Sequence, residues 1–214
     1  MNKIIFITGG ARSGKSTFAE KLAEAIYNHS KEKKKIAYIA TGVPFDKEFK
    51  KRIQIHREKR SKLFETYEED IHIDIKLKEI LSKHKIFLVE CLTTWLGNLF
   101  QKKSLHIENE VNNTIDNIIN LFKDKETKSN PDELIKFLID REKNNYNYSI
   151  KNLFESKNSE KILMIISNEI GMGIVPDNKL SRDFRDLTGK INQKFAKIAQ
   201  FVYLTTSGIP NRIK

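Results

Sequence analysis

A glycine-rich stretch near the start of the chain has the residue types and spacing of a phosphate-binding loop. It reads Gly9-Gly10-Ala11-Arg12-Ser13-Gly14-Lys15-Ser16 and fits G-x-x-x-x-G-K-[ST], between an apolar run and the helical pattern STFAEKLAEAIY. In such a loop, backbone N–H groups and the amino end of the helix surround phosphate oxygens. Lys15 reaches the β- and γ-phosphates, and the Ser16 hydroxyl is a ligand for Mg²⁺. The stretch therefore predicts that the protein binds a nucleoside triphosphate.

Two acidic residues follow apolar runs that have the character of strands. Glu90 ends the run IFLVE, a Walker B pattern in which an acid beside the phosphate loop holds Mg²⁺ or its water shell. Glu169 follows the run ILMIISN and precedes a Gly-Met-Gly sequence, at the strand end where parallel sheets bind ligands. For Glu90 we favour the metal-binding interpretation. For Glu169 an ordinary strand-to-helix connection is an equally good interpretation.

A histidine, His56, lies within the cationic sequence KKRIQIHREKR. Residues 31–62 contain 12 Lys or Arg and 4 Asp or Glu, so this window carries +8 of the net charge of +11. Neighbouring cations disfavour the imidazolium and lower the pKa of a histidine from about 6.5, which leaves a neutral, nucleophilic nitrogen. The same cations attract a polyphosphate. The simpler alternative is a boundary histidine on a solvated basic helix.

Five nearly continuous apolar runs indicate the strands that must position these residues. Helical patterns separate the runs, which lie near Ile4, Ile36, Ile86, Ile162 and Phe201. Continuous rather than alternating apolar strands are typical of parallel sheets that are buried on both faces, and intervening helices imply βαβ connections. The sequence thus predicts an α/β fold in which the phosphate loop, Glu90, Glu169 and the YIATG segment, residues 38–42, meet at one edge of the sheet.

A long helix is predicted from residue 177 to residue 200. Its apolar residues recur at spacings of three and four and form one stripe, which we interpret as core packing: Leu180, Phe184, Leu187, Ile191, Phe195 and Ile198. Residues 123–159 are instead rich in Lys, Asn, Glu and Ser. We predict that they form a polar surface insertion, because they contain too few apolar residues for a separate core. Residues 1–214 are thus predicted to form one domain.

The composition narrows the class of protein and its compartment. Hydrophobic residues make up 39% and charged residues 31%, as in ordinary globular proteins. No apolar run is long enough for a membrane span, and the N-terminus does not have the pattern of a signal peptide. Cys91 is the only cysteine, so no intrachain disulfide can form, and we expect a cytoplasmic protein. Four further histidines show no metal-ligand spacing and are expected at the surface or its boundary: His29, His72, His84 and His106.

Several segments taken together closely resemble one enzyme family. They are GGARSGKS, YIATG, RIQIHREKR, VECLTTWLGNL, SNEIGMGIVPDNKLSRDFRDLTGKINQ and SGIPNRIK, and they follow one another through residues 4–214. In this order they resemble the bifunctional adenosylcobinamide kinase / adenosylcobinamide-phosphate guanylyltransferases of the cobalamin pathway. Very many proteins share a phosphate loop, whereas its combination with NE-x-GMGIVP, FRD and NQ is far more specific. Residues 123–159 lie outside the resemblance.

The resemblance implies a fold, an assembly and two reactions. The fold would be a P-loop NTPase with a RecA-like, mainly parallel β-sheet flanked by helices, and the subunits would form a homotrimer. A nucleoside triphosphate, ATP or GTP, would phosphorylate adenosylcobinamide. GTP would then guanylylate a histidine with loss of pyrophosphate, and the GMP would pass to adenosylcobinamide phosphate to give adenosylcobinamide-GDP. The guanylylated histidine of the family lies in an R-I-x-x-H stretch, which in this chain ends at His56.

The resemblance also implies roles for residues outside that stretch. Residues 9–16 would bind the nucleotide phosphates, with Lys15 taking part in catalysis and with Mg²⁺ on Ser16 and Glu90. Glu68 matches a family glutamate that would reach guanine or ribose. The remaining nucleotide-binding residues that the resemblance implies lie in two short segments: Ala40, Thr41, Gly42, Arg57, Glu58, Lys59 and Arg60.

Three other functions are compatible with parts of the sequence. A small-molecule kinase would use the phosphate loop without any covalent step at His56. An ATPase acting on nucleic acid through the basic window would bind DNA or RNA with a steep salt dependence, but the chain has no recognised nucleic-acid motif, and we expect no such partner. A non-catalytic nucleotide-binding regulator is disfavoured because Lys15, Ser16 and Glu90 are all present.

Overall fold

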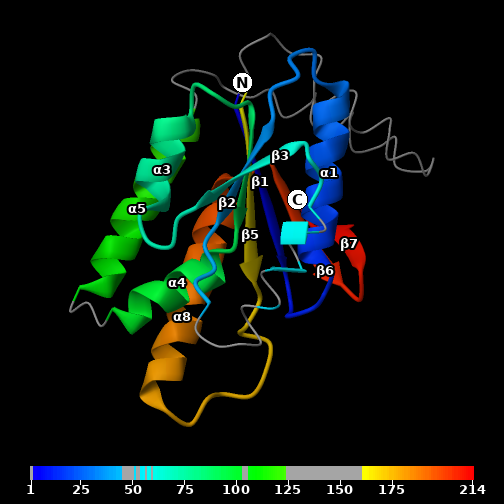
Figure 1. Ribbon diagram of the computed structural model, residues 1–214. Helices are drawn as coiled ribbons and strands as arrows, with labels where there is room; N and C mark the ends of the chain where they lie inside the picture. The colour runs from blue at the N-terminus through cyan, green and yellow to red at the C-terminus, as the bar shows by residue number, and fades with distance from the viewer. Residues whose placement is uncertain are drawn as a thin grey trace.

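The computed structural model describes residues 2–44, 51, 54–55, 57–58, 60–102, 106–123 and 161–214 (Figure 1). The chain begins with strand β1 (Lys3–Gly9) and helix α1 (Lys15–His29), which flank the phosphate loop. The remaining elements follow in chain order: β2 (Ile36–Ala40), β3 (Phe64–Glu68), α3 (Ile73–Ile80), β4 (Ile86–Glu90), α4 (Leu92–Gln101), α5 (Ile107–Phe122), β5 (Ile162–Asn168), α8 (Lys179–Ile198), β6 (Phe201–Thr206) and β7 (Ile209–Arg212).

The strands form one seven-stranded sheet in the order β3-β2-β4-β5-β1-β6-β7. Every neighbouring pair is parallel except β6 and β7, which are antiparallel. The five predicted strands are β1, β2, β4, β5 and β6, and their side chains are almost entirely buried because helices cover both faces. The predicted fold class, a P-loop NTPase with a mainly parallel sheet flanked by helices, is confirmed.

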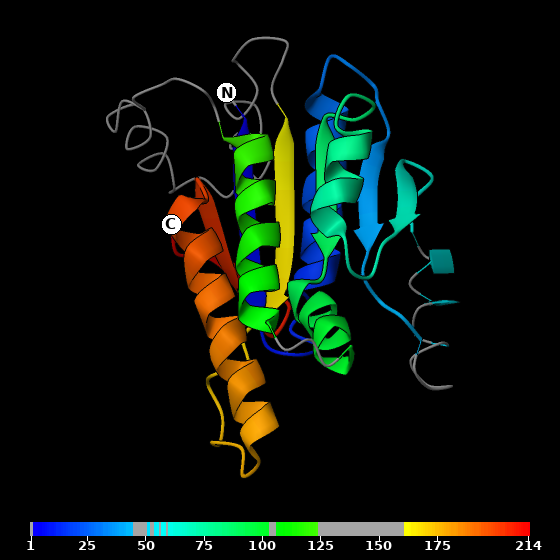
Figure 2. The same ribbon diagram turned by 90° about the vertical axis from the view of Figure 1, so that its left-hand side faces the viewer.

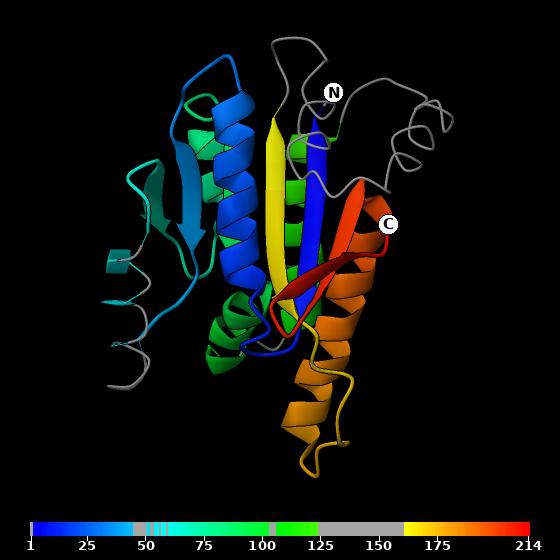
Figure 3. The ribbon, with the colours of Figure 1, turned by 90° about the vertical axis from the view of Figure 1, so that its right-hand side faces the viewer.

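Two layers of helices enclose the sheet. Among the described helices, α1 covers one face (Figure 3), and α3, α4, α5 and α8 cover the other (Figure 2). Alternate residues of β1 accordingly enter two separate cores. Ile5 and Ile7 pack with the α1 side, and Ile4 and Phe6 pack with the side that contains Trp95 of α4.

The sequence pattern did not predict β3 or β7, which form the two edges of the sheet. Strand β3 reads FETYE, and only Phe64 is buried, so it has no apolar run to mark it. Strand β7 follows β6 through a two-residue turn in which Ser207 and Gly208 have φ of 51° and 82°. Positive φ at both turn residues is the geometry of a tight hairpin, and Ser-Gly is a composition that permits it.

Helix α8 confirms the predicted long helix, with one correction. Leu187, Ile191 and Phe195 are buried against the sheet, as the stripe predicts. Leu180 was assigned to the same stripe, but 65% of its surface is exposed. The start of α8 extends past the end of the sheet (Figures 2 and 3), and packing against the core begins only at Phe184.

The histidines differ from expectation at one position. His29, His72 and His106 are exposed, as expected. His84 is only 3% exposed, so its prediction as a surface or boundary residue was wrong. Its ring is satisfied inside the protein, with Nδ1 2.6 Å from the carbonyl oxygen of Lys35 and Nε2 2.9 Å from the hydroxyl of Tyr67.

Several predicted site residues and one predicted segment fall outside the part of the chain that the structure describes. They are His56, Arg52 and Ile53 of the same stretch, Lys59, and the polar insertion at 123–159, of which only Lys123 is described. Within the described ranges, no helix is long and apolar enough to cross a membrane.

Candidate active site

The site lies where neighbouring strands send their connections to opposite faces of the sheet. Strand β1 continues into α1 on one face, whereas β5, which is paired with β1, leads to α8 on the other face. A crevice opens between strands at such a switch point, and α/β proteins bind ligands there. At this point the two connections meet, because the N–H of Glu169 donates to the carbonyl oxygen of Gly9 over 3.0 Å.

The phosphate loop joins β1 to α1 and is held from behind by the β6–β7 turn. The N–H of Gly208 donates to the carbonyl oxygen of Ser13 over 2.8 Å. Gly14 caps α1 with φ of 91°, and a Cβ added there would lie 3.0 Å from Cα of Gly208. A side chain on Gly9 would overlap the carbonyl oxygen of Thr205. Both glycines are therefore needed for the loop to pack against β6 and its turn.

Lys15 is buried within the loop that it serves. Its ammonium donates to the carbonyl oxygen of Gly10 over 3.0 Å, and 8% of the residue is exposed. The amino end of α1 lies at the same place and adds its partial positive charge. The loop therefore brings a fixed cation and the amino end of a helix to the point where a polyphosphate would lie.

Glu90 is fixed from two sides at the end of β4. The hydroxyl of Ser16 donates to its Oε1, and the hydroxyl of Tyr38 donates to its Oε2 over 2.5 Å. The predicted neighbours Ser16 and Glu90 are thus in direct contact. Together they offer two hard oxygen ligands of the kind that Mg²⁺ prefers.

Thr41 lies directly behind Glu90, with its side chain fully buried. Its hydroxyl oxygen accepts from the N–H of Cys91 over 2.8 Å, and the hydroxyl lies 3.0 Å from the carbonyl oxygens of both Glu90 and Cys91. Asn98 of α4 donates to the carbonyl oxygen of Thr41 over 2.7 Å. The side chain of Thr41 therefore holds the segment that carries Glu90. The N–H of Thr41 also donates within the protein, to the carbonyl oxygen of Glu90 over 3.0 Å. Its contact with a nucleotide stays a prediction.

A second carboxylate, Glu20, interacts electrostatically with Glu90. Burial, and then the negative charge of Glu90, raises the pKa of Glu20 to about 7, and the positive charge of Arg60 acts in the opposite direction. A substantial fraction of Glu20 is therefore protonated at neutral pH.

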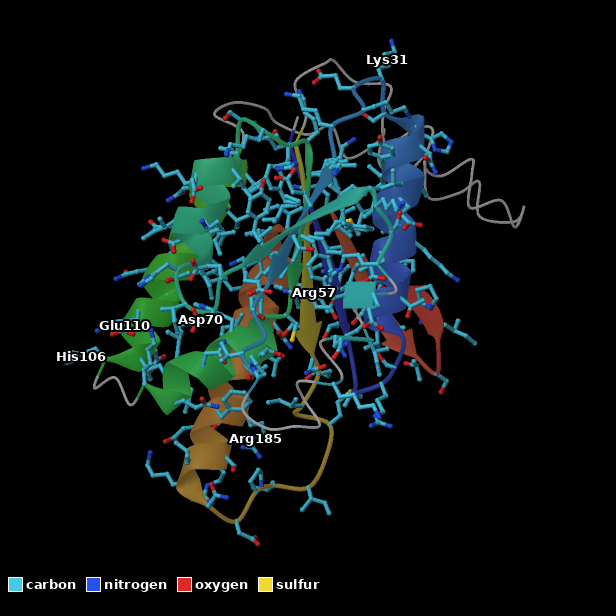
Figure 4. All side chains as sticks on the ribbon, in the orientation of Figure 1. Lys31, Arg57, Asp70, His106, Glu110 and Arg185 are labelled. Carbon is cyan, nitrogen blue, oxygen red and sulfur yellow. The ribbon has the colours of Figure 1, made fainter. Side chains whose placement is uncertain are left out.

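Two arginines of the basic sequence around His56, Arg57 and Arg60, contact residues of β2 and β3. Arg57, labelled in Figure 4, forms an ion pair with Glu68 at the end of β3. The guanidinium of Arg60 lies 3.4 Å from the ring centroid of Tyr38, and its Nη1 donates to the hydroxyl of Thr66 over 2.8 Å. The structure thus brings together Arg57 and Glu68, two residues that the resemblance assigned to nucleotide binding. Glu58, a third such residue, accepts from Gln54 on the exposed surface.

The loop after β5 presents apolar side chains to solvent beside the phosphate loop. Exposed fractions reach 80% for Met172 and 96% for Ile174. Glu169 accepts from the N–H of Gly171 within this loop, over 3.4 Å. Both interpretations of Glu169 stay predictions.

Comparison with known proteins identifies the family that uses this arrangement. The family described as cobinamide kinase / cobinamide phosphate guanyltransferase matches residues 5–130 and 132–213. The chain belongs to this family. Members of the cobinamide kinase / guanyltransferase family are bifunctional enzymes, so the chain is a kinase and a guanylyltransferase of cobalamin biosynthesis.

Named relatives of the family match over nearly the whole chain. The bifunctional adenosylcobalamin biosynthesis protein CobU of Escherichia coli K12 is 32% identical over 212 residues, which cover 99% of both chains. CobU of Salmonella typhimurium LT2 is 33% identical over 215 residues, again 99% of both. CobP of Pseudomonas aeruginosa PAO1 is 29% identical over 208 residues, 97% of this chain and 95% of its own.

Reasoning from the sequence missed three residues that lie beside the candidate site in this structure: Glu20, Tyr38 and Asn98. Glu20 follows Ser16 by one helical turn, so their shared helix face was a signal that could have found it. Tyr38 lies in the YIATG segment. Because side chains alternate between the two faces of a sheet along a strand, Tyr38 lies on the same face of the sheet as Glu90. Asn98 gave no signal, because only the docking of α4 brings it to Thr41.

Proposed function

We propose that this enzyme phosphorylates adenosylcobinamide with a nucleoside triphosphate and then carries GMP from GTP on His56. The phosphate loop, with Ser16 and Glu90 in contact behind it, supports the first reaction. The Arg52-Ile53-Gln54-Ile55-His56 stretch, which matches the guanylylated histidine of the family, supports the second. We further propose that the enzyme works in the cytoplasm.

In the kinase step, the chain binds and orients the triphosphate. Backbone N–H groups of the loop and the ammonium of Lys15 would hold the β- and γ-phosphates, where charge moves as the γ-phosphoryl group leaves. Ser16 and Glu90 would hold Mg²⁺ together with phosphate oxygens and water. That ion would neutralise part of the phosphate charge. The hydroxyl of adenosylcobinamide attacks the γ-phosphorus, and the bond to the β-phosphate oxygen breaks.

In the transferase step, an imidazole nitrogen of His56 attacks the α-phosphorus of GTP. The bond to the bridging oxygen breaks and pyrophosphate leaves, which gives a phosphoramidate. A phosphate oxygen of adenosylcobinamide phosphate then attacks the same phosphorus, and the nitrogen leaves as neutral imidazole. Arg57 follows His56 directly and Arg60 follows it by four positions, and both would hold the triphosphate. Nearby cations favour the neutral imidazole that this attack requires.

We predict that the wild-type enzyme retains radioactive label after incubation with α-³²P-GTP and Mg²⁺ followed by denaturation. The label should be acid-labile and base-stable, as expected for a phosphoramidate, and His56→Ala should abolish it. His29→Ala is the matched control, because His29 is exposed at the far end of α1 and should leave labelling unchanged. Absence of label in the wild type would leave a kinase without a covalent step. Label that persists in His56→Ala would mean that another residue is the nucleophile.

We also propose that copies of the chain associate, as the family resemblance to homotrimers implies. Four exposed apolar residues on the loop after β5 and the first turn of α8 support an interface there: Met172, Ile174, Val175 and Leu180. Large exposed apolar side chains that gather in one region often mark an interface between proteins. Ile174→Asp is predicted to shift the mass measured by light scattering from trimer towards monomer, with Ile75→Asp, exposed on α3, as control. A monomeric wild type would overturn this proposal.

A further inference from the structure

Tyr38 makes two contacts that lead to different parts of the active site. Its hydroxyl donates to Oε2 of Glu90 over 2.5 Å, while the hydroxyl of Ser16 donates to Oε1 of the same carboxylate. Its ring supports the guanidinium of Arg60, 3.4 Å from the centroid. Arg60 follows His56 by four positions in the sequence. One buried side chain therefore connects the phosphate loop to the segment that carries the proposed nucleophile.

We propose that Tyr38 is a positioning residue for both reactions: its hydroxyl orients Glu90 for the kinase, and its ring places Arg60 for the guanylyltransferase. The inference rests on the proposed roles of Glu90 and of residues 57–60. It goes beyond them by assigning one side chain that couples the two activities.

The hydroxyl is suited to orient a carboxylate permanently. Tyr38 is 3% exposed, so water does not compete for the hydrogen bond that its hydroxyl donates to Glu90. With Oε1 directed to Ser16 and Oε2 to Tyr38, the carboxylate is held in one rotation. Groups that orient a metal ligand in this way typically change metal affinity or activity about 10- to 100-fold when removed.

The ring is suited to place a cation that would otherwise be mobile. Arg60 makes one side-chain hydrogen bond in the described part of the chain, from Nη1 to Thr66, and its Nε is buried without a hydrogen-bond partner there. Stacking on Tyr38 is the contact that fixes the plane of the guanidinium. The remaining N–H groups are thereby left in a defined direction to meet a phosphate.

The hydroxyl is tested by Tyr38→Phe, which keeps the ring. We expect the Mg²⁺ concentration for half-maximal kinase activity to rise about tenfold, and we expect saturating Mg²⁺ to restore most of the rate. Tyr67→Phe is the matched control, because the Tyr67 hydroxyl also donates to a carboxylate, Glu65, over 2.7 Å, but at the edge strand β3. An unchanged Mg²⁺ requirement in Tyr38→Phe would overturn the role of the hydroxyl.

The ring is tested by comparing Tyr38→Leu with Tyr38→Phe at saturating Mg²⁺. We expect the leucine variant to form the α-³²P label at least about fivefold more slowly, with a raised KM for GTP, and we expect the phenylalanine variant to label almost normally. Arg60→Met should reproduce the leucine result. Because Arg60 is half-exposed, this variant keeps the test decisive even if Tyr38→Leu fails to fold. Equal labelling by Arg60→Met and wild type would overturn the role of the ring.

The two measurements also separate this inference from the proposed function. If the wild type forms no label, the covalent step at His56 fails, but the Mg²⁺ titration of the kinase still decides whether Tyr38 orients Glu90. If the wild type is labelled and Tyr38→Phe has a normal Mg²⁺ requirement, the covalent step stands and the coupling through Tyr38 fails.

Discussion

Lys15→Ala is expected to lower the kinase rate about 10²- to 10³-fold, with little change in thermal stability. The ammonium is the one side-chain cation within the phosphate loop that is buried, and it is fixed by the carbonyl oxygen of Gly10. Its charge would meet the phosphate oxygens at the moment when charge moves towards the leaving group. Removing one such preorganised donor typically lowers kcat by about 10²- to 10³-fold. The rate is measured with saturating adenosylcobinamide and nucleotide.

The matched control for this variant is Lys21→Ala. Lys21 lies on the same helix but is exposed, so it should leave the kinase rate within about twofold of the wild type. Both variants should melt close to the wild-type temperature, because neither change opens a cavity in an apolar core. If Lys15→Ala kept nearly full activity, the phosphate loop would not be the kinase site. The loop would then serve only the guanylyltransferase reaction.

Thr41→Val is expected to destabilise the fold by about 1–3 kcal/mol and to weaken the kinase at limiting Mg²⁺. The two side chains have almost the same shape, so the change removes only the hydroxyl. The buried N–H of Cys91 then loses its acceptor at 2.8 Å, and the carbonyl oxygen of Cys91 loses a donor at 3.0 Å. A buried polar group without a partner costs about 1–3 kcal/mol. The segment that carries Glu90 should shift in consequence.

Urea unfolding measures the stability part of this prediction. A lower midpoint at an unchanged slope would report a change in stability alone. Thr41→Ser is the control, because serine keeps the hydroxyl and loses only a methyl group; it should retain most of the stability and the normal Mg²⁺ requirement. If Thr41→Val were as stable as the wild type, the hydrogen bonds behind Glu90 would contribute nothing measurable. The role of Thr41 in holding Glu90 would then be wrong.

The sequence alone determined the central strands of the sheet and the elements next to the phosphate loop. Strands buried on both faces need continuous apolar runs, and a phosphate loop needs its glycines, lysine and serine in fixed order, so both leave strong local patterns. The long helix α8 was predicted for the same reason, since burial of one face demands its periodic stripe. The meeting of Ser16 with Glu90 also follows from the sequence, because the carboxyl ends of parallel strands share one edge.

Only the tertiary structure decided which polar side chains meet behind that edge. The contacts of Tyr38 with Glu90 and Arg60, and of Asn98 with Thr41, join residues 22 to 57 positions apart that have no common pattern. The exposure of Leu180 was also invisible locally, because periodicity shows which face of a helix is apolar but not where the sheet beneath it ends. His84 was expected at the surface or its boundary, but in the folded protein its ring is buried and contacts Lys35 and Tyr67. Local patterns record what each element buries, whereas partners for buried polar groups are chosen by the packing of distant elements.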